Sequence, residues 1–340
     1  MDSENLLDIH NLTVRFPIRK KGAGWGDKHF LTAVDDVSFG VKRGKTLAIV
    51  GESGSGKTTA ALAIARLAAG QTTGEVMLDG TDILPLTGDR LKDMRRRVQV
   101  IFQDPYSSLN PRKRAESIVR EPLDNLTDKT EEEKREIVDR LFEAVGLRPE
   151  QKRLFPHQFS GGQRQRIGIA RALSTQPDVI ICDEAVSALD VAVQAQILNL
   201  LRRLQAQFGL TYVFISHDLG VVQHMCDSVA VMYMGKVVEH ADRLSLFNSP
   251  LHPYTAALLS AVPSVDAEVR RNARRILIPG DPPDPLALPK GCRFASRCPA
   301  AKPVCSDMSP DLLDHGGNHR VACTRVTEGM NPIFETREPI

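Results

Sequence analysis

A short apolar run that ends in a glycine-rich loop constrains this fold more than any other feature of the chain. Thr46-Leu-Ala-Ile-Val50 is followed at once by Gly51-Glu-Ser-Gly-Ser-Gly-Lys57-Thr58, which fits the phosphate-loop pattern G-x-x-x-x-G-K-[ST]. A continuous apolar run of this kind is typical of a buried parallel strand, and the helix formers after Thr58 predict a helix. Strand, loop and helix in this order indicate a phosphate-binding α/β domain.

The loop carries the groups that phosphate binding needs. Its glycines let successive backbone N–H groups turn toward one point, and the start of the following helix adds further donors. Lys57 supplies a fixed positive charge, and the hydroxyl of Thr58 is suited to ligating Mg²⁺. We expect the nucleotide to be bound here, by Gly51, Ser53, Gly54, Ser55, Gly56, Lys57, Thr58 and Thr59.

Two adjacent carboxylates end a second apolar run. Asp183 and Glu184 follow Val179-Ile-Ile-Cys, where buried carboxylates are costly unless they have a function. We expect Asp183 to hold Mg²⁺ through water and Glu184 to act as the general base on the attacking water.

Composition divides the rest of the chain. Apolar content of 42% and charged content of 25% are ordinary for a globular protein, and strand-like runs recur at 33–41, 212–215 and 229–232. Between about 104 and 171 they give way to helical spacing such as Ile137, Leu141 and Val145. Strands alternating with helices predict a mainly parallel, three-layer α/β sheet with an inserted helical subdomain. A proline-rich sequence after about Ser260 predicts a separate small C-terminal module.

Three further motifs complete an ordered set. Ser160-Gly161-Gly162-Gln163 precedes a predicted helix, where a hydroxyl and two glycine amides form an anion site. Ser187-Ala-Leu-Asp190 and Ser216-His217-Asp218 follow. With the loop and the two carboxylates, these motifs resemble those of the nucleotide-binding subunit of an ABC transporter, and the resemblance covers nearly all of the chain.

The resemblance implies a P-loop NTPase sandwich with an antiparallel β subdomain, and ATP as the nucleotide. It places Gln103 where a glutamine links Mg²⁺ and the attacking water to the helical subdomain, and His217 where a switch histidine contacts the γ-phosphate. It also implies a head-to-tail dimer, in which Ser160, Gly161, Gly162 and Gln163 close over the partner's ATP and Asp190 lies at the shared seam. ATP would close the dimer, and hydrolysis would release it.

Two positions depart from the family pattern, and one role stays open. Ala185 stands where proline is usual and Phe159 where leucine is usual; neither change removes a reacting group. The aromatic partner of adenine is expected at Phe16, whose position matches the family's, although Phe16 shares the apolar side of its strand. Trp25 and Phe30 are the alternatives.

Four of the six cysteines lie in the tail. Cys292, Cys298, Cys305 and Cys323 have the spacing C-x5-C-x6-C-x17-C, and clustered thiols in a cytosolic chain suggest metal rather than disulfides. Together with Leu251-His-Pro-Tyr-Thr255, this segment looks like the C-terminal extension of oligopeptide and dipeptide importer ATPases. That likeness implies a [4Fe–4S] cluster, with zinc or free thiols as alternatives. Cys182 and Cys226 lie in apolar surroundings and are expected to be buried.

The resemblance therefore predicts an ATP-binding domain over 1–260 and an importer-type extension over 261–340. It is strongest to the second, F-type ATPase of peptide importers, which implies a sister ATPase, two transmembrane permease subunits and an extracytoplasmic solute-binding protein as partners. The net charge of +2 gives no reason to expect nucleic acid, and no membrane span or secretory signal is apparent. We expect a peripheral protein on the cytoplasmic face of the inner membrane. Nickel, opines or oligosaccharides remain alternative cargoes, and a soluble, non-transport ABC ATPase is the alternative of a different class.

Overall fold

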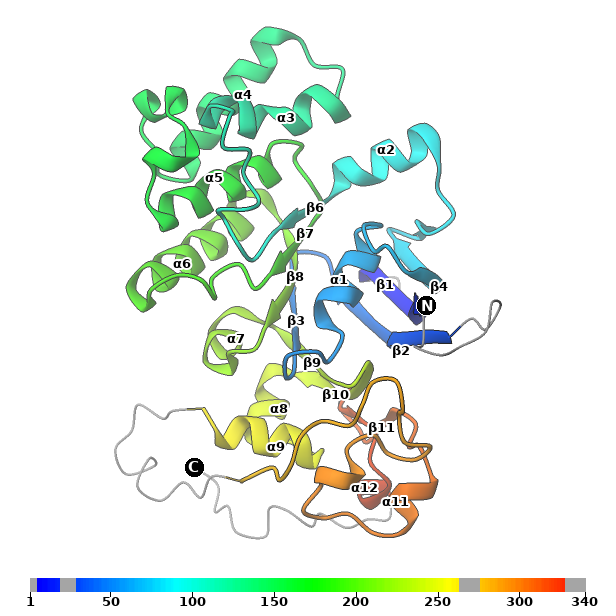
Figure 1. The fold of residues 1–340 in the computed structure, drawn as a ribbon. Coiled ribbons are helices and arrows are strands. Elements are labelled where there is room, and N and C mark those ends of the chain that lie inside the picture. Colours follow the sequence, from blue (N-terminus) through cyan, green and yellow to red (C-terminus); the bar gives the residue numbers. More distant parts are fainter. Residues whose placement is uncertain (1–4, 19–28, 263–275, 328–340) are drawn as a thin grey trace.

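Two β-sheets lie at the centre of the molecule (Figure 1). The computed structural model describes residues 5–18, 29–262 and 276–327. The smaller sheet is antiparallel, with the strand order β2-β1-β4-β5. Its strands are β1 (Asn5–Ile18), β2 (His29–Lys42), β4 (Gln71–Leu78) and β5 (Thr81–Asp82).

The larger sheet has the order β11-β12-β10-β9-β3-β8-β7-β6. Its parallel part consists of β6 (Val98–Ile101), β7 (Val179–Asp183), β8 (Thr211–Ser216), β3 (Thr46–Val50) and β9 (Ser228–Tyr233). The strand predicted at 46–50 is confirmed, as are those predicted near 179, 212 and 229. Since β3 pairs with both β8 and β9, the loop that follows it lies at the middle of the carboxyl edge of the parallel strands.

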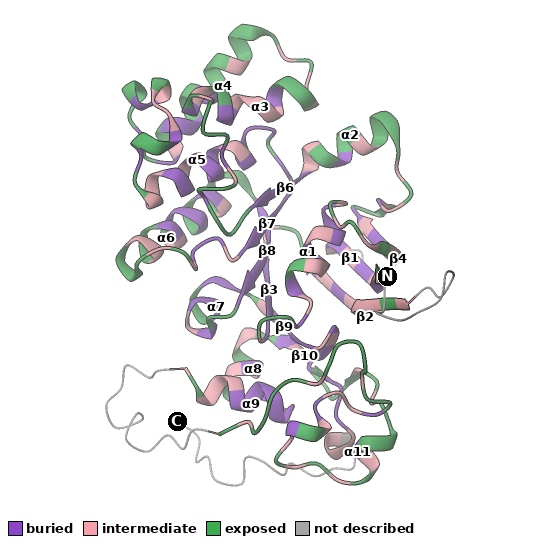
Figure 2. Cartoon of the chain, viewed as in Figure 1, coloured by how far each residue is buried: buried purple, intermediate pink, exposed green. Residues whose placement is uncertain are grey.

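Both faces of the parallel strands are buried, which explains their continuous apolar sequences (Figure 2). In β3, Leu47 and Ile49 pack with the antiparallel sheet and with helix α1 (Lys57–Ile64). Ala48 and Val50 pack on the opposite side, against a core that includes α5 (Gly161–Leu173), α6 (Val191–Phe208) and α7 (Leu219–Met225). The predicted three-layer arrangement follows from this alternation.

A group of helices lies at one end of the larger sheet, at the top of Figure 1. After α2 (Gly88–Arg97) and β6, the chain forms α3 (Ala115–Leu126), α4 (Glu131–Ala144), two short 3-10 helices (Pro149–Arg153 and Pro156–Gln158) and α5. Helix α4 begins with a capping box, in which Thr130 and Glu133 each accept the other's backbone N–H. Its apolar face buries Ile137 and Leu141, as their spacing predicts.

The tail is attached to the larger sheet. It follows β10 (Lys236–Asp242), α8 (Arg243–Asn248) and α9 (Pro253–Ser260) and contains η3 (Ala295–Arg297), α11 (Val304–Asp307), β11 (Leu313–Asp314), β12 (Arg320–Val321) and α12 (Thr324–Thr327). Strand β12 pairs antiparallel with β10 and with β11. The structure differs here from the expected separate module, because the tail covers the edge of β10 that would otherwise present unpaired backbone groups.

The tail also joins the main core. Phe294 is 1% exposed and packs on Tyr233 of β9 and Tyr254 of α9, with ring centroids 5.2 and 5.3 Å away. Within the described part of the chain, no helix combines the length and apolar character needed to cross a membrane.

Candidate nucleotide site

The glycines of the phosphate loop occupy backbone conformations that other residues rarely adopt. Gly51, Gly54 and Gly56 have φ angles of 151°, 78° and 100°. At Gly51 a Cβ atom would lie 2.1 Å from the carbonyl oxygen of Met232, and at Gly56 it would lie 2.3 Å from that of Ala33. The loop is therefore packed against neighbouring backbone on two sides, which fixes the directions of its N–H groups.

The lysine of the loop is held within it. Lys57 Nζ donates to the carbonyl oxygens of Gly51 and Glu52, both at 2.8 Å. Burial lowers the pKa of Lys57, whereas the nearby carboxylates of Glu184 and Asp183 act to raise it. The ammonium group therefore stands over the loop beside the two carboxylates that the sequence analysis selected.

Thr58 and Asp183 form an oxygen pair that fits Mg²⁺. The Thr58 hydroxyl donates to Asp183 Oδ1 at 3.0 Å, although 125 residues separate them. Neighbouring ligands of an octahedral Mg²⁺, bound at 2.0–2.1 Å, are about 2.9 Å apart. Burial raises the pKa of Asp183, and the hydrogen bond from Thr58 opposes that shift. A hard oxygen pair at this spacing suits a magnesium ion.

Glu184 lies between the other two predicted catalytic residues. Gln103 Nε2 donates to Glu184 Oε2 at 2.7 Å, and His217 Nδ1 lies 3.3 Å from Glu184 Oε1. The side chain of His217 is 58% exposed and that of Glu184 is 16% exposed. The carboxylate is thus oriented from both sides while still reaching solvent, as a base that activates water requires.

The backbone of Glu184 is strained. Its φ of 47° lies in the left-handed region, which costs a residue with a Cβ about 1 kcal/mol or more. The Glu184 N–H donates to the carbonyl of Ile215 at 3.1 Å, and the Ser187 N–H and hydroxyl both donate to the Glu184 carbonyl. These bonds hold the sharp turn that directs the carboxylate away from the end of β7.

One pocket of about 600 Å³ gathers most of these groups, although the buried Gly51, Ser55 and Asp183 are not among its lining residues. It is lined by Ala33, Ser53, Gly54, Gly56, Lys57, Thr58, Thr59, Gln103, Glu184 and His217. Ala33, on β2, is the lining residue that the sequence analysis did not select, and no motif marks it.

The remaining predicted nucleotide contacts lie outside that pocket. Ser160 caps α5, where its hydroxyl accepts the Gln163 N–H at 3.3 Å and the Gln163 side chain accepts the Ser160 N–H at 3.0 Å. Gly161 and Gly162 form the first turn of α5. Asp190 caps α6 and is exposed. In the single chain, Ser160 and Asp190, which cap α5 and α6, are exposed to solvent.

The aromatic candidates for adenine are also outside the pocket. Phe16, near the end of β1, is partly buried against the core of the antiparallel sheet. Phe30 on β2 is 37% exposed. Trp25 lies outside the described residues.

The expectation of an iron–sulfur cluster is wrong. In the described ranges, no group of three or more His, Cys, Asp or Glu side chains is placed to hold a metal ion. Cys292, Cys298, Cys305 and Cys323 line one small void of about 20 Å³, room for about one water molecule. Burial raises the pKa of Cys292, of Cys323 and, to about 11, of Cys298, so these thiols are neutral in the metal-free chain.

The other thiols of the described chain behave as expected. Cys182 and Cys226 are buried, and burial raises the pKa of each. None of the six cysteines is in a disulfide.

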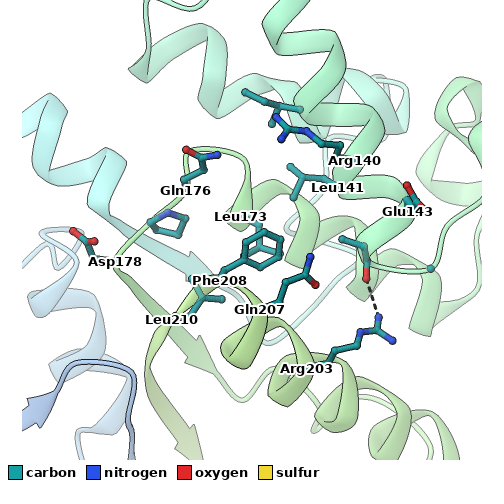
Figure 3. Close-up of a pocket in the computed structure, with 15 residues that line it drawn as sticks. Arg140, Leu141, Glu143, Leu173, Gln176, Asp178, Arg203, Gln207, Phe208 and Leu210 are labelled. Atoms are coloured by element: carbon teal, nitrogen blue, oxygen red, sulfur yellow. Dashed lines mark hydrogen bonds between the residues drawn. The ribbon is translucent and has the colours of Figure 1, made fainter.

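A larger pocket, of about 790 Å³, lies away from these groups (Figure 3). It is formed by α4, the end of α6 and the segment before β7; Arg203 donates to the Ala144 carbonyl at 2.8 Å beside it. Pro177, Asp178 and Leu210 precede β7 and β8, so this pocket is at the amino edge of the parallel strands. The phosphate loop is at the carboxyl edge, where α/β sheets bind their ligands. We therefore assign nucleotide binding to the smaller pocket, at the phosphate loop.

Comparison with known proteins defines the class. Residues 34–187 match the family "ABC transporter", and residues 238–305 match the "Oligopeptide/dipeptide transporter, C-terminal region". Among solved structures, the ATP-binding cassette MJ0796, described as dimeric in a post-hydrolysis state with ADP and Pi, is 28% identical with a TM-score of 0.61. It covers 70% of this chain and 98% of its own.

Curated relatives narrow the assignment. The oligopeptide transport ATP-binding protein AppF of Bacillus subtilis (strain 168) is 47% identical, over 95% of this chain and 98% of its own. The dipeptide transport ATP-binding protein DppF of Escherichia coli (strain K12) is 46% identical, over 96% of each chain. The chain belongs to the ATP-binding subunits of ABC transporters, within the oligopeptide/dipeptide family, and it has the P-loop ABC ATPase fold.

Proposed function

We propose that this protein hydrolyses ATP to power the import of dipeptides, oligopeptides or similar solutes. The observation that carries the proposal is the arrangement around Glu184, which faces the phosphate-loop pocket between Gln103 and His217. The names of the relatives, which are oligopeptide and dipeptide transport ATP-binding proteins, supply the cargo class.

In this proposal each group has a defined task. The loop amides and Lys57 bind the β- and γ-phosphates, and Glu184 accepts a proton from the attacking water. Gln103 orients that water and links it to the helices that follow, while His217 contacts the γ-phosphate. Thr58 and Asp183, with Gln103, would hold Mg²⁺, which neutralises charge on the phosphates when it is bound.

A second subunit completes each site. Ser160, Gly161, Gly162 and Gln163 form a capped helix start that does not line this chain's own pocket, and an anion bound there would come from a partner. We propose a head-to-tail pair with a sister ATPase, with Asp190 at the seam and with Phe16 stacking on adenine, Trp25 and Phe30 being the alternatives. The solved relative described as a dimer with ADP and Pi supports such a pair.

The proposed assembly lies on the cytoplasmic face of the inner membrane. It contains two permease subunits that receive energy through the helices after Gln103, and an extracytoplasmic solute-binding protein that delivers cargo. Residues 1–260 would form the ATP-binding domain and 261–340 the cysteine-containing extension, although the match to the importer C-terminal region already begins at 238. Nickel, opine or oligosaccharide import would use the same ATPase role.

Isolation of the complex tests the assembly. The tagged subunit would be extracted from native membranes in mild detergent, and its partners identified by mass spectrometry. We expect two polytopic membrane proteins, a sister ATPase and a binding protein whose ligand names the cargo. Recovery of only ribosomal or DNA-associated proteins would refute the transport role while leaving the ATPase chemistry intact.

A further inference from the structure

An arginine of the tail is bonded to the phosphate loop. Arg297, the last residue of η3, donates from Nη1 to Glu52 Oε2 at 2.8 Å and from Nη2 to Glu52 Oε1 at 3.3 Å. Glu52 is the second residue of the loop, and 245 positions separate the pair. The side chain of Arg297 is 8% exposed and that of Glu52 is 29% exposed, so this two-pronged pair is partly shielded from water.

The backbone of the same loop residue is held as well. The Glu52 N–H donates to the hydroxyl of Tyr254 at 2.7 Å, and the Glu52 carbonyl accepts from Lys57 Nζ at 2.8 Å. Each polar group of Glu52 therefore has a partner. Two of the three partners, Tyr254 and Arg297, come from the region that matches the importer C-terminal family, whereas Glu52 lies in the ABC transporter match.

The position of Arg297 is itself fixed by packing. Its Nη1 lies 3.2 Å from the Tyr233 hydroxyl, and three residues earlier Phe294 packs on the rings of Tyr233 and Tyr254. Arg293, one residue before Phe294, pairs with Asp35 and donates to the carbonyl of Met234. The tail segment thus contacts the sheet domain at several points around the loop.

A carboxylate in this position opposes the function of the loop. Glu52 adds negative charge beside amides that bind a triphosphate, and like charges within a few ångströms repel strongly where water is excluded. Paired with Arg297, that charge is compensated. Without Arg297 the Glu52 carboxylate, whose side chain is 29% exposed, is left unpaired beside the phosphate-binding amides, where its charge opposes that of the nucleotide.

We propose that Arg297 is a positioning residue of the ATPase, which neutralises Glu52 and fixes the phosphate loop so that ATP binds more tightly when the tail is docked. The tail then acts on the nucleotide site through Glu52, which belongs to the phosphate loop but is not among the residues that line the pocket. The inference requires only that this loop binds ATP.

A charge-neutralisation test separates this role from simple packing. Binding of a fluorescent ATP analogue would be measured on the full-length subunit for Arg297→Gln, Glu52→Gln and the double variant. We expect Arg297→Gln to weaken binding about tenfold, the size typical of losing one charge-assisted bond. Glu52→Gln leaves only the positive guanidinium, which does not oppose a triphosphate, so binding should stay within about threefold of the wild type. The double variant should return to that range, because neither charge remains.

Three controls accompany the test. Arg325→Gln removes another tail arginine, which donates to the Ala300 carbonyl within the tail, and should leave binding unchanged. Lys57→Ala should abolish binding; if it does not, the loop is not the ATP site and the premise fails. Thermal unfolding of each variant tests whether the protein, including the tail, remains folded. If Arg297→Gln does not fold, Arg297→Lys serves in its place, since lysine keeps the charge but loses the second hydrogen bond to Glu52. We expect Arg297→Lys to weaken binding of the analogue about threefold. Adding Glu52→Gln to this variant should restore the lost affinity.

Two results would overturn the proposal. In the first, Arg297→Gln, or its lysine replacement, binds the analogue as well as the wild type. In the second, the double variant binds as weakly as Arg297→Gln alone, so that the carboxylate plays no part and the arginine acts only through packing.

Discussion

The phosphate loop and the tail cysteines differ in how their chemical groups are brought together. In the loop, consecutive residues supply the amides, the ammonium and the hydroxyl, and glycine φ angles between 78° and 151° set their directions. The result is a pocket of about 600 Å³ lined by polar groups. The cysteines are spread over 292–323, and they surround a void of about 20 Å³.

The comparison shows what a spacing pattern can establish. A motif of adjacent residues fixes backbone geometry, because each residue constrains the next. Widely spaced cysteines only show that thiol ligands are present in the sequence. The conformation of the intervening chain determines whether those thiols come together to bind a metal. The loop motif therefore predicted a pocket, whereas the cysteine spacing predicted a cluster that the structure does not support.

The largest expected effect is on turnover. Glu184→Gln keeps the shape of the side chain and the phosphate loop but removes the base, so kcat in the assembled transporter should fall by about 10²–10⁴-fold while ATP affinity is retained. The measurement is steady-state ATP hydrolysis together with nucleotide binding. Glu132→Gln, an exposed change on α4, is the matched control. Near-normal turnover in Glu184→Gln would refute the assigned role.

Next in size is the backbone of the loop. Gly51→Ala places a Cβ atom 2.1 Å from the Met232 carbonyl at a φ of 151°, and we expect a loss of about 2–4 kcal/mol in the free energy of unfolding. Gly168→Ala, in the middle of α5 with open space around it, should instead add about 0.5–1 kcal/mol. Chemical denaturation of both variants gives the comparison. Equal stabilities would show that the loop yields to the added methyl group.

The tail thiols should react slowly. With burial raising the pKa of Cys298 to about 11, little thiolate exists at pH 8, and alkylation in the folded protein should be at least about tenfold slower than in the unfolded chain. Mass spectrometry after timed labelling resolves each cysteine. Equal rates at Cys292, Cys298 and Cys323 in the two states would contradict the buried, neutral state described for them.

The smallest effect concerns pH. Burial lowers the pKa of His252 and His240 to about 4, whereas both titrate near 6.5 when unfolded. Between pH 6.5 and 4 the unfolded chain therefore binds protons that the folded one does not, so stability falls as pH falls, by about 1–2 kcal/mol per histidine at pH 5.

A variant isolates one histidine's share of this effect. His252 caps α9, its Nδ1 accepting the Tyr254 N–H at 3.1 Å, and His252→Asn keeps a capping acceptor without the titration. Its unfolding free energy should depend less steeply on pH below 6.5 than that of the wild type. An unchanged slope would assign the pH dependence to other groups.

Several parts of the fold and site could be predicted from residues alone. Continuous apolar runs mark strands buried on both faces, and a carboxyl edge shared by parallel strands brings Thr58 to Asp183 across 125 residues. The contact of Arg297 with Glu52 could not be predicted, because a single arginine 245 positions away carries no periodicity and no motif. Nor could the two-residue strands β11 and β12, which are too short to show an alternating pattern.

Strand β3 leaves the ribosome long before either of its neighbours. Thr46 pairs with Tyr212 of β8, and Leu47 pairs with Ser228 of β9. Until most of the chain has been synthesised, this apolar strand lacks both of its neighbours in the larger sheet, and the glycine loop after it lacks the Met232 carbonyl against which Gly51 packs. Pairing between strands so distant in sequence makes folding slow, and it leaves aggregation-prone apolar segments exposed until the partner strands are available. A nascent chain of this protein would thus gain its ATP site late, and would depend on protection from aggregation for most of its translation.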